Sequence, residues 1–188
     1  ALTAGHDLQI ANGVNSSQME EHFKTSGTSG VASKTTLEQH TLINSQTAQG
    51  SMLSGDSVAL LAGNNLQLQG SDIVGTQDVR LSAGNNLTVT AAQQQRDEVH
   101  VKQESTSGLS GTGGVGISYG KNEQKSTSES HSTHARGSTV GSVQGNLLMQ
   151  AGSELRVDGS DVVAGKDLTL TGKTLTLSAA EQTLSQKQ

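Results

Sequence analysis

A chain of 188 residues with no cysteine or tryptophan and 1% aromatic residues has neither disulfides nor aromatic packing as its source of stability. The net charge of −5 and the scattered Lys and Arg residues exclude a nucleic-acid partner, and no apolar run approaches the roughly 18 residues of a membrane-spanning helix. The 31% hydrophobic residues form short aliphatic clusters, which favours an elongated protein with a narrow core over a disordered chain.

Residues 1–10 carry the first copy of a short pattern. Ala4 to Ile10 has the form Ala-Gly-x-x-apolar-x-apolar, and the same form returns at residues 83–89. Alternating apolar and polar residues are typical of short strands with one buried face. We therefore expect a first coil here, and because the chain starts in the middle of the pattern we interpret it as a piece of a longer protein.

Residues 11–50 interrupt this pattern with a polar, Ser/Thr/Gln-rich segment. Met19, Glu21 and Phe23 alternate with charged or histidine residues, which fits a half-exposed strand. The glycine-rich centre, residues 26–30, predicts a turn. The segment is therefore predicted to be an antiparallel β-hairpin.

Residues 51–91 resume the coils. Gly63 to Leu68 returns as Gly84 to Val89, an offset of 21 residues (87 − 66). A repeat of this length buries its apolar side against the next copy, so we expect three short strands per coil, with Leu87 lying on Leu66 and Leu81 on Leu60. Side-chain amide ladders are expected at one corner, pairing Asn64 with Asn85 and Asn65 with Asn86.

A second interruption, residues 92–137, resembles the first. Val99 and Val101 lie in its outgoing part, residues 107–114 form a Gly/Ser-rich centre that predicts a turn, and Val115, Ile117 and Tyr119 alternate in the returning part. The coils then resume over residues 138–180. Since residues 62–81 align with residues 151–170, the larger repeat is 89 residues long (151 − 62) and holds two coils and one hairpin.

These patterns predict an all-β fold, a parallel β-helix (β-solenoid) of about 20–21 residues per coil with projecting antiparallel β-hairpin insertions. The crossover rule for parallel strands favours a right-handed winding. We expect one solenoid over residues 1–188. Its coils are predicted at residues 1–10, 51–91 and 138–180, its hairpins at 11–50 and 92–137, and a truncated third insertion at 181–188.

No residue pattern predicts catalysis, a cofactor or a metal. His131 and His134 are three residues apart, and His100 lies on the opposite arm of the same hairpin. Residues three apart in a strand face opposite sides, which favours solvated histidines over a metal site. Asp72 and Asp161 recur at equivalent corners, which indicates turn capping rather than acid–base chemistry.

The two aromatic residues, Phe23 and Tyr119, both lie in the insertions. One interpretation is that each packs within its hairpin or against the coils. The other is a contact surface that adds Val99, Val101, Val115 and Ile117, because exposed apolar hairpins can enter membranes or pair with other sheets. These six residues are the candidate interaction site.

The G-x-x-L-x-L coils, the Gly-Ser-Asp corners at residues 70–72 and 159–161, and the Gly/Ser-rich hairpins resemble the haemagglutinin repeats of filamentous haemagglutinin-like exoproteins. Two coils alternating with a hairpin such as residues 108–120 look most like the later repeats of CdiA-type contact-dependent growth inhibition toxins. The resemblance implies a right-handed parallel β-helix, export through an outer-membrane two-partner-secretion transporter, and a secreted or cell-surface location. It also implies that toxic activity lies in a C-terminal domain outside this chain.

The expected function is a non-enzymatic shaft segment whose hairpins contribute to contact with the target outer membrane or a surface receptor during toxin delivery. A first alternative is an adhesin stalk that binds host surfaces. A second is a solenoid polysaccharide-active enzyme, which the scarcity of aromatic residues for sugar stacking disfavours. End-to-end self-association of coil stacks is a further expectation, because terminal coils present unpaired strand edges.

Overall fold

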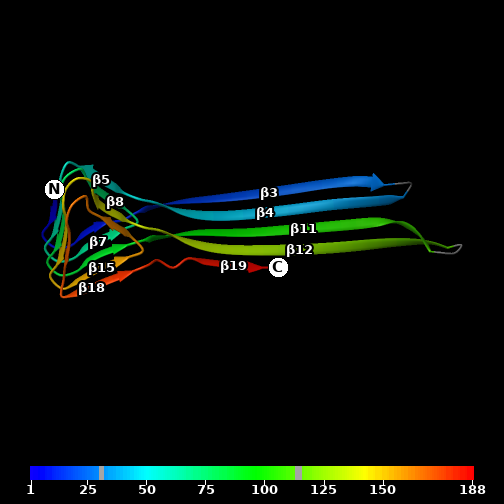
Figure 1. The fold of residues 1–188 in the computed structure, drawn as a ribbon. Coiled ribbons are helices and arrows are strands. Elements are labelled where there is room, and N and C mark those ends of the chain that lie inside the picture. Colours follow the sequence, from blue (N-terminus) through cyan, green and yellow to red (C-terminus); the bar gives the residue numbers. More distant parts are fainter. Residues whose placement is uncertain (30–31, 113–115) are drawn as a thin grey trace. The chain divides into compact units, whose positions relative to one another are not determined.

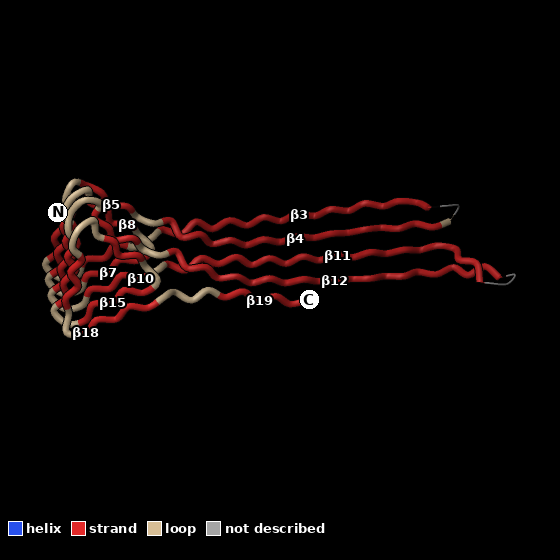
Figure 2. The backbone as a smooth tube through the Cα atoms, in the orientation of Figure 1, coloured by secondary structure: helices blue, strands red, loops and turns tan. Residues whose placement is uncertain are grey.

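The computed structural model describes residues 1–29, 32–112 and 116–188, and its regular structure there consists of β-strands (Figures 1 and 2). Among these residues there is no helix long and apolar enough to cross a membrane. The chain divides into two compact units. The first comprises residues 1–15, 46–94 and 133–183, and the second comprises residues 16–45, 95–132 and 184–188.

Three parallel sheets build the coils of the first unit. One sheet contains, in order, β1 (Leu2–Ala4), β6 (Val58–Ala62), β9 (Val79–Ala83), β14 (Leu147–Ala151) and β17 (Leu168–Thr171). A second contains β2 (Leu8–Ile10), β7 (Leu66–Gln69), β10 (Leu87–Thr90), β15 (Glu154–Asp158) and β18 (Thr174–Ser178). The third contains β5 (Met52–Gly55), β8 (Asp72–Gly75), β13 (Thr139–Ser142) and β16 (Asp161–Val163). The predicted parallel β-helix is confirmed, and these strands form five successive coils.

The register between coils follows the sequence repeat. Leu87 pairs with Leu66 and Leu81 pairs with Leu60, as predicted. Leu87 also pairs with Leu155, although the second hairpin lies between them in sequence. A hairpin insertion therefore leaves the stacking of the coils intact.

The core of the coils is a set of aliphatic columns made by the inward positions of each strand. Leu66 is 1% exposed and Leu155 is fully buried, whereas Gln67 between Leu66 and Leu68 is exposed. The repeat predicts that Leu168 faces inward in the same way, because it is the counterpart of Leu147 in the next coil, but this prediction is wrong: Leu168 is 46% exposed. Its register partner Leu147 is fully buried, and the difference arises because β17 is the last strand of its sheet.

The corner asparagines do not pair as predicted. Asn85 donates its side-chain amide to Oδ1 of Asn65 (3.2 Å), not to Asn64. Asn64 instead donates to Asp7 Oδ1 (2.9 Å) in the coil before it. The side chains are offset because each oxygen also accepts a backbone N–H of the following coil.

The long strands form a separate sheet in the order β3 (Gly13–Ser29), β4 (Ser33–Gln49), β11 (Ala92–Thr112), β12 (Gly116–Arg136) and β19 (Thr183–Lys187). Figure 1 shows β3, β4, β11 and β12 as long neighbouring strands. Each 89-residue repeat thus adds two strands to this sheet and two coils to the stack.

The glycine-rich centres are mainly strand, which corrects the predicted turns. β3 continues to Ser29 and β11 to Thr112, while residues 30 and 113–114 lie outside the described part of the chain. Within that part, only Gly70 and Gly159 have positive φ, so Gly27 and Gly108 adopt ordinary extended backbone. Ser and Thr between the glycines are compatible with strand hydrogen bonding, and tertiary pairing decides the conformation.

Candidate contact surface on the hairpin strands

Cross-strand contacts show which residues of the first hairpin share a face. His22 Nε2 lies 2.9 Å from Glu38 Oε1, and His40 Nε2 lies 2.9 Å from Glu20 Oε1. Residues 22 and 20 of β3 thus face residues 38 and 40 of β4, which is the descending order of an antiparallel pair. Even-numbered residues of β3 and β4 consequently share one face in this region.

Two further contacts extend the assignment across the sheet. Thr41 Oγ1 lies 2.8 Å from His100 Nδ1, so odd-numbered residues of β4 and even-numbered residues of β11 lie on the same face of the sheet. His131 contacts Asp97, so odd-numbered residues of β11 and odd-numbered residues of β12 also share a face. We call the side that carries His22, Glu38 and His131 the histidine face, and the opposite side the Phe23 face.

The candidate residues do not all lie on one face. Because side chains alternate along a strand, Val99, Val101 and Tyr119 belong to the histidine face, whereas Phe23 lies on the opposite one. Ile117 lies in β12 without a described side chain, and Val115 lies outside the described residues. The structure therefore groups three candidates and separates the fourth.

Exposure distinguishes the candidates further. Tyr119 is 71% exposed and Phe23 is 50% exposed, whereas Val99 and Val101 are half-buried. Met19 on the Phe23 face and Leu109 on the histidine face are also exposed, at 61% and 54%. Leu109 is not among the six candidates because the glycines around it predict a turn, whereas in the structure it lies in β11, which continues through this segment.

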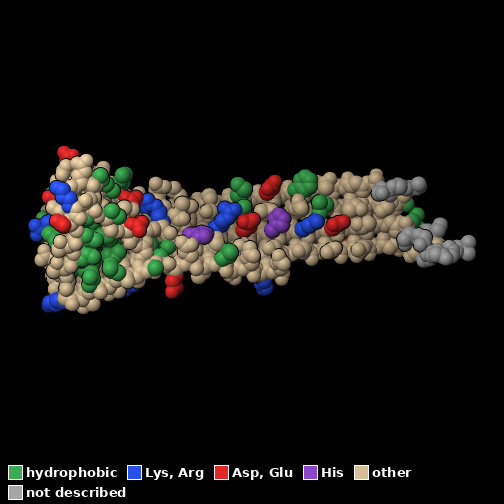
Figure 3. All heavy atoms as spheres, viewed as in Figure 1, with side chains coloured by type: hydrophobic (Ala, Val, Ile, Leu, Met, Phe, Trp, Pro, Cys, Tyr) green, Lys and Arg blue, Asp and Glu red, His purple; other side chains and the backbone are tan. Residues whose placement is uncertain are grey.

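Charged groups lie beside these apolar side chains on the histidine face. Glu38 accepts a hydrogen bond from His22, and Lys24 Nζ lies 3.5 Å from its other oxygen. The His22 hydrogen bond and the Lys24 charge together lower the pKa of Glu38 below its ordinary value of 4.5. Figure 3 shows acidic, basic and histidine side chains close to one another along the long strands, with a few hydrophobic side chains among them. This surface is mainly polar, with single apolar side chains between ion pairs.

The histidines considered for metal binding do not form one site. His100 contacts Thr41 on the Phe23 face, whereas His131 contacts Asp97 on the histidine face. Throughout the described parts of the chain, no group of three or more His, Cys, Asp or Glu residues is arranged to hold a metal ion.

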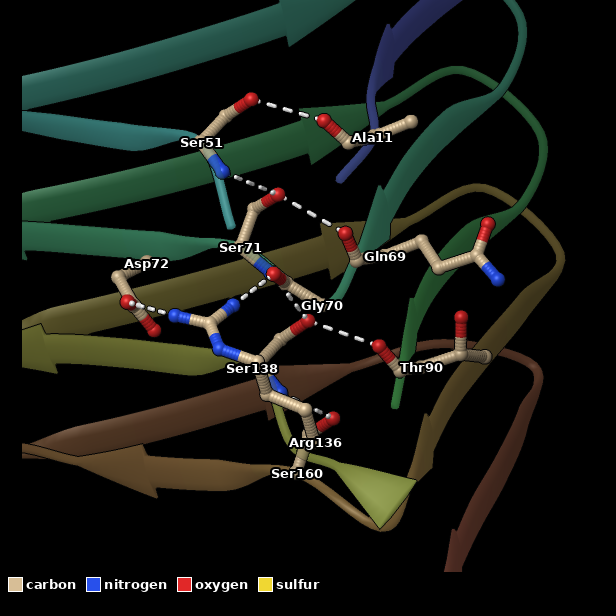
Figure 4. A network of polar contacts seen from close by, with 10 residues as sticks. All are labelled: Ala11, Ser51, Gln69, Gly70, Ser71, Asp72, Thr90, Arg136, Ser138 and Ser160. Carbon is tan, nitrogen blue, oxygen red and sulfur yellow. Dashed lines mark hydrogen bonds and ion pairs between the residues drawn. The ribbon is translucent and has the colours of Figure 1, made fainter. Parts of the chain in front are cut away.

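A polar network joins successive coils in the first unit (Figure 4). Ser51 donates its backbone N–H to Ser71 Oγ (3.2 Å), Ser71 likewise to Ser138 (3.1 Å), and Ser138 to Ser160 (3.1 Å). The hydroxyls of Ser71, Ser138 and Ser160 thus each accept a hydrogen bond from the preceding coil, and the Ser51 hydroxyl donates to the carbonyl oxygen of Ala11. This column satisfies buried backbone groups at a corner where the chain turns.

Arg136 adds a second contact to this corner. Its guanidinium donates to the carbonyl oxygen of Gly70 and lies 3.1 Å from Asp72 Oδ2 (Figure 4). The side chains of Arg136 and Asp72 are 30% and 28% exposed. Asp72 therefore pairs with the end of the second hairpin, a contact that the sequence did not predict.

Stacked coils with a hairpin inserted in every second coil define a repeat-built parallel β-helix. The hemagglutinin repeat family matches residues 30–126 and 117–188, and the chain belongs to this family. This match and the similarity to CdiA proteins given below confirm the resemblance to the haemagglutinin repeats of CdiA-type proteins. No match to the chain was found among solved structures.

Several CdiA proteins are similar to this chain. It is 42% identical over 140 residues to "Toxin CdiA" of Yersinia pestis, 36% identical over 187 residues to "tRNA nuclease CdiA-2" of Burkholderia pseudomallei, and 44% identical over 136 residues to "Deoxyribonuclease CdiA" of Yersinia pseudotuberculosis. These matches cover 74%, 100% and 72% of the chain. The chain spans only 4%, 6% and 12% of the respective relatives.

Proposed function

We propose that this chain is a non-enzymatic structural segment of a large secreted bacterial surface exoprotein, a contact-dependent inhibition toxin, and that its hairpin strands contribute to contact with the target-cell envelope during toxin delivery. The observation that carries the contact role is the exposure of Tyr119 (71%), Phe23 (50%) and Leu109 (54%) on the long strands. Exposed apolar side chains on a mainly polar sheet are suited to a reversible interaction surface.

The structural role is supported by the range of relatives that share the region. Their names describe a tRNA nuclease, a deoxyribonuclease and a 16S rRNA endonuclease. Each of these relatives is nevertheless 36–44% identical to this chain over most of the 188 residues of this chain. A region common to proteins with different named activities is poorly suited to carry any one of them. Its buried residues are instead the aliphatic columns that hold the coils together.

Export and location follow as parts of the same proposal. The family resemblance supports passage through an outer-membrane two-partner-secretion transporter and display at the bacterial surface. The small, aliphatic core and the serine and asparagine corners let each coil be completed by the next one, which suits a chain that folds coil by coil after crossing a membrane.

The contact role is tested by binding to outer-membrane vesicles. We expect Tyr119→Ser and Phe23→Ser to weaken binding, because each removes exposed apolar area from the long strands. Val143→Ser is the matched control, since Val143 is 62% exposed but belongs to the coil-forming unit. Equal binding by all three variants and the parent chain would contradict the contact role.

The adhesin alternative predicts that the same variants lose binding to host extracellular matrix instead of to bacterial vesicles. Both assays on the same variants therefore separate the two functions. The enzyme alternative predicts cleavage in a screen of polysaccharides, whereas our proposal predicts none.

A further inference from the structure

The Gly-Ser-Asp corner occurs twice in the coils with the same backbone. Gly70 has φ 51° and Gly159 has φ 55°, and they are the only residues with positive φ in the described ranges. A Cβ atom on Gly70 would overlap Ala92, and one on Gly159 would overlap Ala180. The two corners are thus equivalent positions of the 89-residue repeat, built from the same kinds of residues.

The first corner is occupied by Arg136. Its guanidinium donates to the Gly70 carbonyl and pairs with the Asp72 carboxylate at 3.1 Å. Arg136 ends β12, and the chain continues through Gly137 into β13, which pairs with β8. The planar guanidinium suits this corner because it donates to two oxygens in fixed directions at once.

The second corner has the same backbone contacts without the arginine. Asp161 donates its N–H to Ser138 O (2.8 Å), just as Asp72 donates to Ser51 O (2.8 Å). The Asp161 side chain is exposed and makes no hydrogen bond or ion pair with any described residue. β16, which begins with Asp161, has β13 as its one neighbour in the described sheet, whereas β8 lies between β5 and β13.

The glycines beside the two corners support the equivalence independently. Gly50 precedes Ser51, and a Cβ atom on it would overlap the Arg136 guanidinium and lie 2.5 Å from the Gly70 carbonyl oxygen. Gly137 precedes Ser138 in the same way, and a Cβ atom on it would lie 2.7 Å from the Gly159 carbonyl oxygen. Gly50 leaves room for the guanidinium at the first corner, and Gly137 occupies the equivalent position at the second corner.

We propose that the Gly159–Asp161 corner is a binding site for an arginine side chain that lies just before a further coil strand, in a segment built like residues 136–141 of this chain. The guanidinium donates to the Gly159 carbonyl and pairs with the Asp161 carboxylate, while the following strand pairs with the open edge of β16. The partner is thus another repeat of this kind. The site couples one 89-residue repeat to the next and is independent of the contact role of the hairpins.

The test uses an extended protein in which the full chain is followed by a second copy of residues 101–188, so that the repeat continues in register. Asp161→Asn is combined with Arg→Gln at the added copy's equivalent of Arg136. We expect each substitution to lower the midpoint of thermal unfolding by about 2–4 °C, and the double variant to be no less stable than either single one. In the original chain Asp161→Asn should leave the midpoint unchanged.

The occupied corner provides the internal reference. Asp72→Asn and Arg136→Gln should lower the midpoint and couple in both proteins, because that pair is already formed. If this reference pair couples in the extended protein while Asp161→Asn remains neutral there, the proposal is wrong.

A second measurement applies if the extended protein does not unfold cooperatively. A peptide of residues 134–142 is added to the original chain, and the amide NMR signals of Ser160 and Asp161 are followed. We expect saturable shifts that are lost when Gln replaces the peptide's arginine. The absence of shifts with the arginine peptide, or equal shifts with both peptides, would overturn the proposal.

Discussion

The side-chain oxygen of Asn65 accepts the backbone N–H of Asn86 at 3.3 Å, which links one coil to the next through a corner residue. The same relationship joins Asp7 to the N–H of Asn65 (3.0 Å) and Asn86 to the N–H of Glu154 (3.3 Å). Each corner residue therefore supplies an acceptor for a backbone donor that the turn leaves without a strand partner. This column depends on the acceptor oxygen, so Asp and Asn are interchangeable along it.

Asp7 should make the stability of the coils sensitive to acid. The Asn65 N–H, followed by the contacts with His6 and Asn64, lowers the pKa of Asp7 below its ordinary value of 3.8. The unfolded chain therefore binds a proton at Asp7 more readily than the folded chain does. Ionised Asp7 stabilises the fold above pH 3.8, and this stabilisation is lost as the pH falls through the lower pKa of the folded state. Between about pH 5 and pH 3, Asp7→Asn should flatten the fall of the unfolding free energy measured in urea. A variant as acid-sensitive as the parent chain would contradict this role.

Gly84→Ala should destabilise the coils. A Cβ atom there would overlap the carbonyl of Gly63, and Gly63 and Gly152 are placed in the same way over Gly5 and Gly84. Because these carbonyls are fixed by the coil stacking, we expect a loss of about 1–3 kcal/mol. Gly5→Ala is the control: its Cβ would meet nothing within 4 Å, and its effect should stay within about 0.5 kcal/mol. Denaturant unfolding compares the two, and equal losses would refute the proposed glycine column.

Leu66→Ala should cost about 2–5 kcal/mol of unfolding free energy, because Leu66 is 1% exposed and its removal leaves a cavity between coils. Gln67→Ala, one residue along the same strand, should cost no more than about 0.5 kcal/mol, because Gln67 faces solvent. Thermal or urea unfolding measures both. Comparable losses would show that the inward and outward positions of β7 are assigned wrongly.

Leu147→Ala and Leu168→Ala test the same register position in neighbouring coils. Leu147 is fully buried and Leu168 is 46% exposed, so truncating Leu147 should be the more damaging change, by about 2 kcal/mol or more. An equal loss at both positions would mean that Leu168 is covered in solution, for example by end-to-end association of chains. Sedimentation of the parent chain then identifies that association.

The coil register could be predicted from the sequence because the repeat is a strict spacing of apolar pairs. Leu66 and Leu87 are each followed, two residues on, by a second apolar residue, and only one alignment of the coils buries both pairs. The exposure of Leu168 could not be predicted in this way, since burial depends on whether another coil covers the position. Periodicity describes the repeat and not its boundary.

The candidate surface was less predictable. Alternation within one strand places Val99 and Val101 together, but the side of the sheet on which Phe23 lies depends on how two hairpins pair with each other. The Arg136–Asp72 pair was missed for a related reason: the two residues are 64 positions apart and only the stacking of coils brings them together. Contacts between residues this far apart in sequence require the three-dimensional register.

The most direct test of the account uses engineered disulfides, and the absence of cysteine gives a clean background. Thr88 pairs with Arg156 across the inserted hairpin, and Thr88 also pairs with Gln67 on its other side. Since adjacent strands are about 4.8 Å apart, Thr88→Cys with Arg156→Cys should form a disulfide on oxidation, whereas Gln67→Cys with Arg156→Cys, two strands apart, should not. If mass spectrometry finds the first crosslink without the second, β10 and β15 are neighbours in register, and the hairpin inserted between them in sequence does not interrupt the stack of coils. The reverse result, or neither crosslink, would contradict this arrangement.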